Sequence, residues 1–208
     1  MIEASHLTRQ IGRTTAVSNV SFDIQNNEVV GLLGPNGAGK TTIMRMLSGY
    51  LEPSTGSVFV NGENLGQNAY SIQRQLGYLP ENLPVYPDMM VADYLDYVAT
   101  IKGIARSERI RAVKEALIST EMTAHALQKI DKLSRGQKQR VGVAQAVLGR
   151  PSFLILDETT NGLDPHQTEQ MRGLIAQLTR SATIMLTTHI MQEVEALCDR
   201  VLIIRNVQ

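Results

Sequence analysis

The chain has 208 residues, of which 43% are hydrophobic and 19% are charged, as in an ordinary globular protein. Lys plus Arg equals Asp plus Glu, at 20 each, so no global electrostatic field favours nucleic acid or an anionic membrane surface. The single cysteine, Cys198, excludes an internal disulfide, and no apolar run approaches the roughly 18 residues that span a bilayer. We therefore expect one cytosolic domain that binds no nucleic acid and reaches a membrane only through a partner.

Four short apolar runs have the composition of parallel strands buried on both faces, at 29–33 (VVGLL), 153–156 (FLIL), 183–186 (TIML) and 201–204 (VLII). Helical patterns lie between them. The helical face that follows the first run consists of Ile43, Met46, Leu47 and Tyr50. The face that precedes the third run consists of Met171, Leu174, Ile175 and Leu178. Alternating strands and helices predict an α/β fold with a parallel sheet.

Two further regions break this alternation. Segments 15–30 and 56–62 are typical of short antiparallel strands with glycine-containing turns. Residues 90–148 lack a strand pattern and predict three successive helices. The first covers 91–101, the second begins at Ser107 with Ile110, Val113 and Leu117 on one face, and the third follows Ser134. We therefore predict a helical subdomain, 89–148, inserted into a core formed by 1–88 and 149–208.

The stretch GPNGAGKT at 34–41 lies between a predicted strand and a predicted helix, the context in which GxxxxGK[ST] indicates a phosphate-binding loop. Its glycines let backbone N–H groups face an anion at the positive end of the helix. Lys40 would reach the outer phosphates and Thr41 would ligate Mg²⁺. The alternative is a glycine-rich turn with an incidental lysine. The candidate nucleotide-binding residues are Gly34, Pro35, Asn36, Gly37, Ala38, Gly39, Lys40, Thr41 and Thr42.

The run at 153–156 ends in two adjacent acids, Asp157 and Glu158. Alone, such a pair would favour a solvated turn after a strand. A phosphate loop, however, needs a second support for its metal at the end of another buried strand, and Asp157 occupies that position. Glu158 points to the other side of the strand end, where it can orient and deprotonate a water molecule. We therefore predict a metal ligand followed by a general base.

A third motif, LSRGQ at 133–137, lies between the phosphate loop and these acids. With GYLPEN at 77–82, NGLD at 161–164 and TTH at 187–189, the motifs occur in the order found in the ATPase subunits of ABC transporters, which the chain resembles over essentially its whole length. The resemblance implies a Mg²⁺-dependent ATPase. It also implies a P-loop NTPase core with a parallel sheet, a small antiparallel β-subdomain and an inserted α-helical subdomain that carries the signature motif.

The resemblance assigns roles to further residues. Ser134, Gly136 and Gln137 of the signature would receive a phosphate of the ATP that another subunit's P-loop holds. Ser134 and Gln137 also form a capping-box pattern, S-x-x-Q, which by itself explains a helix start. His189 would contact the γ-phosphate and hold Glu158 and the water in place, although a lone histidine at a strand end is usually ordinary.

The NGLD segment, 161–164, matches the D-loop of the family. Asp164 before Pro165 is a good helix N-cap followed by proline at the first helical position. By resemblance, the same Asp164 would touch the facing subunit. The two roles are compatible.

Four residues depart from the family pattern. Ile11 stands where many members stack an aromatic ring on adenine, so only apolar contact with the base is expected. Glu81 replaces a glutamine, but a carboxylate can still approach Mg²⁺ or its waters. Arg135 replaces a glycine of the signature, and we expect its side chain to point outward with little effect. Thr159 replaces a proline, which frees the backbone and adds a donor, so we expect a modest change in rigidity and retained catalysis.

The resemblance implies an ATP-driven dimer, formed by two copies or by this chain and a sister subunit, that sandwiches ATP head to tail. Transmembrane permease subunits would hold it on the cytoplasmic face of the cell membrane. They would dock on the helical subdomain and the segment 81–91 (ENLPVYPDMMV). The details most resemble type-2 ABC exporters. Relatives usually continue beyond the position of Gln208, so the sequence leaves open whether the chain is truncated there.

Three other functions are alternatives to the transporter subunit. A soluble ABC ATPase acting on ribosomes or nucleic acid would normally carry two such units in one chain. A chromosome-maintenance ATPase would need a long coiled coil, whereas only about ninety residues without sustained heptads separate Lys40 from Leu133. A weakly hydrolysing regulatory subunit is disfavoured by the intact Lys40, Asp157, Glu158 and His189, while Ile11 and Thr159 leave it open.

Overall fold

A computed structural model describes residues 1–205, and the last three residues of the predicted core segment 149–208 lie outside the described residues. The elements, in chain order, are β1 (Ile2–Ile11), β2 (Thr14–Ile24), β3 (Val29–Leu33), α1 (Lys40–Leu47), β4 (Thr55–Val60), β5 (Glu63–Asn64), α2 (Ala69–Gln73), β6 (Leu76–Leu79), α3 (Val91–Ile101), α4 (Arg106–Ser119), two 3₁₀ turns (Thr123–His125 and Ile130–Lys132), α5 (Arg135–Val147), β7 (Phe153–Asp157), α6 (Pro165–Leu178), β8 (Thr183–Thr188), α7 (Met191–Leu197) and β9 (Arg200–Ile203).

The centre of the molecule is a five-stranded parallel sheet with the order β6-β7-β8-β3-β9. The four predicted strands are confirmed, and β6 is an additional strand at the edge. All five residues of β7 are buried, and successive side chains belong to different hydrophobic clusters. Phe153 and Ile155 face one cluster, and Leu154 and Leu156 face the other. Burial on both faces explains why this strand reads as a continuous apolar run.

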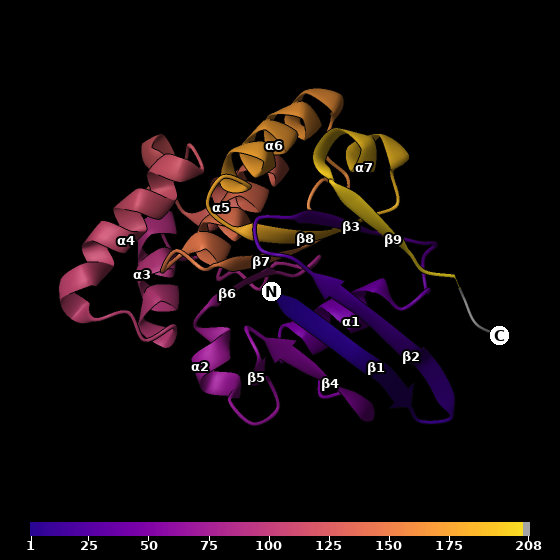
Figure 1. Cartoon of the computed structure of the whole chain (residues 1–208). Helices are drawn as coiled ribbons and strands as arrows, with labels where there is room; N and C mark the ends of the chain where they lie inside the picture. The colour runs from indigo at the N-terminus through magenta and orange to yellow at the C-terminus, as the bar shows by residue number, and fades with distance from the viewer. Residues whose placement is uncertain (206–208) are drawn as a thin grey trace.

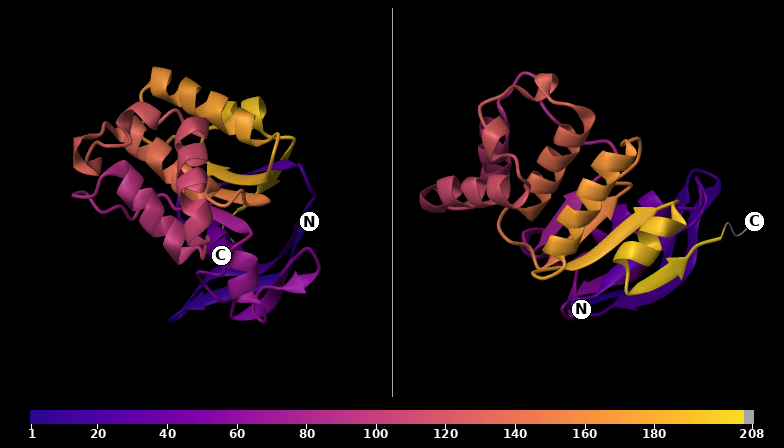
Figure 2. Two further views of the ribbon diagram at one scale, coloured as in Figure 1. Left: turned by 90° about the vertical axis from the view of Figure 1, so that its left-hand side faces the viewer. Right: turned by 90° about the horizontal axis from the view of Figure 1, so that it is seen from above.

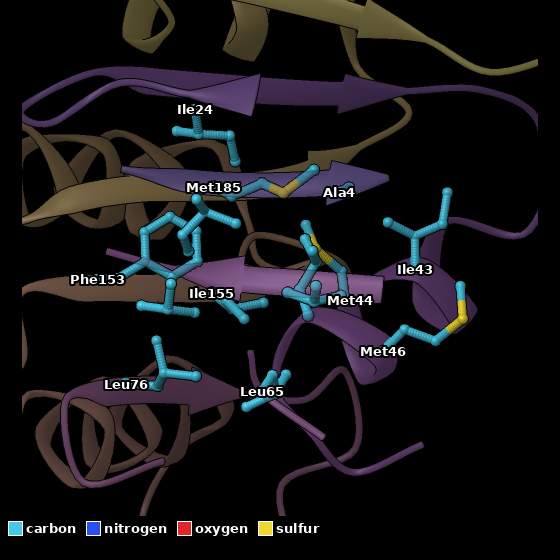
Figure 3. Packing of buried hydrophobic residues seen from close by; sticks show 14 of the residues in the cluster. Ala4, Ile24, Ile43, Met44, Met46, Leu65, Leu76, Phe153, Ile155 and Met185 are labelled. Atoms are coloured by element: carbon cyan, nitrogen blue, oxygen red, sulfur yellow. The ribbon is translucent and has the colours of Figure 1, made fainter. Parts of the chain in front are cut away.

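A second, antiparallel sheet has the order β2-β1-β4-β5. It and the parallel sheet enclose α1, while α5, α6 and α7 lie on the other face of the parallel sheet (Figure 1). Side chains from both sheets and from α1 meet in the first cluster (Figure 3). The predicted antiparallel segments correspond to β2 and β4. Strand β1, with the polar sequence IEASHLTRQI, was not predicted, although it pairs with both.

Helices α3 and α4 lie beside the two sheets (Figure 2), and together with one side of α5 they bury a third hydrophobic cluster. The predicted helix 91–101 is confirmed, as are the helix after Ser134 and the helix that begins near Ser107. No helix within residues 1–205 combines the length and the apolar composition needed to cross a bilayer.

Two side chains predicted on buried faces are exposed. Tyr50 is 75% exposed because α1 ends at Leu47 and the left-handed Gly49, with φ of +73°, turns the chain away from the helix axis. Ile110 is 82% exposed because the buried residues of α4 all lie in its second half, at Val113, Ala116 and Leu117.

The contact between β6 and α5 leaves no room for a side chain at Gly77. A Cβ there would overlap the carbonyl oxygen of Ala146 and lie 2.5 Å from Cδ2 of Leu154. We expect Gly77→Ala to lower the free energy of unfolding by about 1–3 kcal/mol, the usual cost of overpacking, in urea titrations. Gly173→Ala is the matched control because a Cβ at Gly173 in α6 meets nothing within 4 Å. It should be neutral or stabilising by up to about 1 kcal/mol, and equal effects of the two variants would contradict this packing.

Candidate active site

The carboxyl ends of three neighbouring strands gather the predicted site residues at one edge of the parallel sheet. The phosphate loop follows β3, the two acids follow β7, and β8 lies between these strands. In the strand register Asp157 pairs with Thr187, and Leu33 pairs with Thr188. The strand order therefore brings together residues that are more than 140 positions apart in the sequence.

The phosphate loop uses its glycines in two ways. Gly37 and Gly39 have φ of +82° and +95°, the left-handed region that favours glycine. Gly34 is needed for space, since a Cβ there would lie 2.7 Å from the carbonyl oxygen of Ile204. Helix α1 then begins at Lys40 with no side-chain cap and no acid in its first turn. Its first backbone N–H groups can therefore receive an anion.

Lys40 is only 6% exposed, and its ammonium is held by the loop itself. Its Nζ donates to the carbonyl oxygens of Gly34 at 2.8 Å and Pro35 at 3.3 Å, and it lies 3.7 Å from Oε1 of Glu158. A buried ammonium requires such partners. The oxygens of a phosphate would offer stronger, charged acceptors at the same place.

Asp157 is fully buried at the end of β7. Its Oδ1 accepts from the Thr187 hydroxyl at 2.5 Å, whereas its Oδ2 has no hydrogen-bond partner among the described residues. Burial is the main cause that raises the pKa of Asp157, and the hydroxyls of Thr187 and Thr41 oppose the shift. A buried, unpartnered carboxylate oxygen beside Thr41 has the chemistry of a Mg²⁺ ligand.

Glu158 and His189 form a close pair. The Nδ1 atom of His189 lies 2.8 Å from Oε2 of Glu158. Because an ionised carboxylate only accepts, Nδ1 carries the proton in this pair, which leaves Nε2 for a further contact. Glu158 also has φ of +50°, an uncommon conformation that costs about 1–3 kcal/mol, and its N–H donates to the Thr187 hydroxyl at 2.9 Å.

Thr187 is the site residue that the sequence analysis missed. Its hydroxyl connects both acids, donating to Asp157 and accepting from the backbone of Glu158. The TTH motif predicts a role for its histidine, whereas nothing in the sequence distinguishes the threonine two positions earlier from an ordinary strand residue. Only the register between β7 and β8 identifies its role.

The remaining predicted residues lie around this centre. Ser134 and Gln137 form the predicted capping box at the start of α5, and Asp164 caps α6 by accepting from the N–H of Gln167 at 2.9 Å. Within residues 1–205, Glu81 forms no hydrogen bond or ion pair, and Ile11 is 57% exposed at the β1–β2 hairpin. The start of that hairpin's second strand covers the phosphate loop, since the Ala16 carbonyl would lie 2.5 Å from a Cβ at Gly39.

Two departures from the family pattern now have a structural context. Arg135 is exposed, as predicted, but it also makes a contact that was not predicted. Its Nη2 donates to the carbonyl oxygen of Asn161 at 2.8 Å, because the D-loop lies against the start of α5. Thr159 is 4% exposed, and its Oγ1 has no partner among the described residues. Its effect on rigidity and turnover stays a prediction.

The raised pKa of Asp157 predicts an effect on stability. The folded protein binds this proton more tightly than the unfolded chain, so the favourable contribution is present below the unfolded pKa and is lost as the pH rises through the folded pKa. Above the unfolded pKa this carboxyl therefore lowers stability in a way that a neutral side chain of the same shape would not. We expect Asp157→Asn to raise the melting temperature of the nucleotide-free protein at pH 7, by about 2–4 °C for each kcal/mol relieved.

Asp164→Asn is the matched control for this measurement. Asparagine caps a helix as well as aspartate does, so this variant should melt close to the wild type. If Asp157→Asn melts at or below the temperature at which Asp164→Asn melts, the buried Asp157 carboxyl is not destabilising and this interpretation is contradicted.

Comparisons with known proteins agree with this geometry. The model of a family described as ABC transporter matches residues 17–161. The chain is 36% identical over 207 residues to the ABC transporter ATP-binding protein YhaQ of Bacillus subtilis, covering 99% of this chain and 68% of YhaQ. It is 37% identical over 208 residues to the bacitracin transport ATP-binding protein BcrA of Bacillus licheniformis, covering 99% and 67%. The chain thus spans about two thirds of the length of these relatives.

Solved structures share the fold. The structure of cbiO1 from Clostridium perfringens, part of the ABC transporter complex cbiONQ, has a TM-score of 0.86 and 26% identity, covering 98% of this chain and 84% of cbiO1. The dimeric structure of MJ0796, a bacterial ABC transporter cassette, has a TM-score of 0.87 and 24% identity, covering 98% and 94%. The chain belongs to the ABC transporter family, as one of its ATP-binding and ATP-hydrolysing subunits.

Proposed function

We propose that this chain hydrolyses Mg²⁺-bound ATP at the edge formed by β3, β7 and β8, and that the resulting opening and closing of a dimer powers an exporter. The observation that carries the proposal is the convergence of Lys40, Asp157, Glu158 and His189 on the phosphate loop. Each of these side chains performs a separate task on one phosphate chain. ATP is favoured over GTP because the sequence has no NKxD-like guanine element.

The phosphates bind first to groups that the protein already holds in place. The backbone N–H groups of the loop and of the first turn of α1 face the anion, and Lys40 exchanges the Gly34 and Pro35 carbonyls for the outer phosphates. This exchange also removes the lysine from Glu158. Ile11, exposed beside the loop, offers an apolar contact to the base.

Thr41 and the unpartnered Oδ2 of Asp157 would hold Mg²⁺, with Glu81 approaching through a bound water. Among residues 1–205 no group of three or more His, Cys, Asp or Glu side chains can hold a metal ion. Mg²⁺ suits this arrangement because it is usually bound by one or two carboxylates together with substrate phosphates. When bound, the ion would neutralise charge that develops on the phosphates.

Glu158 is the proposed general base. A water molecule placed beside the γ-phosphate would donate its proton to the Glu158 carboxylate as it attacks. His189 positions that carboxylate through Nδ1 and presents Nε2 to the phosphate. Thr187 fixes the backbone of the same glutamate, so its carboxylate is oriented from both ends.

A second subunit completes the proposed site. The start of α5 is the positive end of a helix, and its first turn contains no acid. Ser134, Gly136 and Gln137 would receive the phosphate of an ATP held by the facing P-loop, and Asp164 would touch that subunit. The dimeric structure of MJ0796 supports such an assembly for this fold. Residues 89–148 form the proposed helical subdomain that carries this surface, and closure excludes water from both sites.

Permease subunits would dock where the helical subdomain exposes aromatic side chains. Tyr86 packs edge-on against Tyr97, with ring centroids 5.6 Å apart, and both rings are about half exposed, as is Met90. Exposed aromatic and methionine side chains are enriched at interfaces. The names of BcrA and of the cbiONQ complex support a transporter assembly, which would hold the chain at the cytoplasmic face of the membrane.

Replacement of the proposed base tests the enzymatic part. We expect Glu158→Gln to lower kcat for ATP about 10²- to 10⁴-fold, because the amide cannot accept the proton, while ATP binding is retained. ATP-bound dimers should then accumulate in light-scattering measurements with Mg²⁺. Glu169→Gln, an exposed acid on α6, should leave turnover unchanged. Equal turnover of wild type and Glu158→Gln would exclude this mechanism, and a wild type without turnover would favour the regulatory subunit.

Copurification tests the transporter part. We expect the double variant Tyr86→Ala/Tyr97→Ala to retain about tenfold less of the transmembrane subunits that copurify with the wild-type protein, because both exposed rings are lost from one interface. Its intrinsic ATPase activity should be unchanged. Ile110→Ala, which removes a still more exposed apolar side chain on α4, should have no effect. Copurification with ribosomal proteins in place of membrane subunits would contradict the proposal.

A further inference from the structure

Arg135 joins the signature helix to the D-loop of its own chain. It is the first residue of α5, and its Nη2 donates to the carbonyl oxygen of Asn161 at 2.8 Å. The guanidinium also lies over Gly162, so closely that a Cβ at that position would overlap it. The side chain therefore bridges two segments that are 26 residues apart in the sequence.

The position of Arg135 is unfavourable for its own helix. A cation at a helix N-terminus meets the positive end of the helix dipole, and α5 has no acid in its first turn to compensate. The contact that accounts for the conformation of Arg135 is therefore outside the helix, at the partly negative carbonyl of Asn161. A guanidinium is always charged and has five N–H donors, one of which meets this carbonyl.

A second contact joins the same two segments. The side-chain amide of Gln167 lies against Gly136, at 3.0 Å from the position of a Cβ. Gln167 also donates its backbone N–H to the Asp164 cap of α6. The starts of α5 and α6 are thus in direct contact, and Arg135 adds the polar connection to the loop between β7 and α6.

That loop leads directly to the proposed base. The N–H of Asn161 donates to the carbonyl oxygen of Glu158 at 3.1 Å, and the N–H of Leu163 donates to that of Thr160 at 3.2 Å. Arg135 therefore holds the carbonyl of a residue whose amide is bonded to Glu158. Thr159, inside this turn, contributes no side-chain hydrogen bond of its own. Within residues 1–205, Arg135 is the one side chain of α5, the signature helix, that donates a hydrogen bond to this turn.

We propose that Arg135 is a positioning residue that keeps the turn 158–162 attached to the start of α5. Through it, a movement of the signature helix is transmitted to the D-loop and to Glu158 of the same chain. The inference rests on the proposed function for its effect on turnover, while the attachment itself exists without nucleotide. Arg135 acts on the turn and touches no reacting atom.

Amide hydrogen exchange of the nucleotide-free chain tests the attachment directly. We expect Arg135→Ala to speed exchange in a peptide that covers 158–164 by about tenfold, as in local opening, with global stability nearly unchanged. Arg135→Lys should restore most of the protection, since an ammonium can also donate to the Asn161 carbonyl. Lys138→Ala, one turn further along the same helix, is the control and should exchange like the wild type in this peptide.

Steady-state kinetics test the consequence for turnover. We expect Arg135→Ala to lower kcat about tenfold, because a misplaced catalytic group loses rate, with KM for ATP unchanged and partial recovery in Arg135→Lys. Unchanged exchange in 158–164 would overturn the proposal. A raised KM with unchanged exchange would also overturn it and would assign the guanidinium to the phosphate of the facing subunit. An inactive wild type would refute the proposed function. The attachment of the turn 158–162 to α5 would then be tested by hydrogen exchange alone.

Discussion

The position of β8 between β3 and β7 is the constraint on which the site depends. Because the strands are parallel, their carboxyl ends meet at one edge of the sheet, and the strand register sets which residues face one another there. Thr187 at the end of β8 holds Asp157 and the backbone of Glu158, and the next residues deliver His189 to the Glu158 carboxylate. A one-residue slip in this register would move Asp157, Glu158 and the phosphate loop away from one another at the same time.

The nucleotide-free site is already satisfied internally. Lys40 donates its hydrogen bonds to loop carbonyls and lies near Glu158, and His189 pairs with the same carboxylate. The buried Oδ2 of Asp157, in contrast, has no hydrogen-bond partner within residues 1–205. Binding of a phosphate chain therefore exchanges contacts at the lysine and adds contacts at the aspartate. The site is organised in advance for charge, which is how enzymes lower the cost of reorganisation during the reaction.

The sequence predicts those features that depend on local pattern. The buried run at 153–156, the phosphate loop at 34–41 and the caps at Ser134 and Asp164 all appear where expected, since each is set by neighbouring residues. Strand β1 escaped prediction because its polar composition hides the pairing with β2 and β4. The contact of Arg135 with Asn161 and the role of Thr187 were not predicted, because each depends on a segment distant in sequence.

We propose that Asp157, which β7 places at the sheet edge beside Lys40 and Thr41, couples the binding of Mg²⁺ to the binding of nucleotide. The most direct measurement is calorimetric titration with ATP, with and without Mg²⁺, of the wild type and of Asp157→Asn. The structure predicts that Mg²⁺ tightens binding of ATP to the wild type and has little effect on the variant, because the unpartnered Oδ2 is replaced by an amide. An equal dependence on Mg²⁺ in both proteins would contradict the claim.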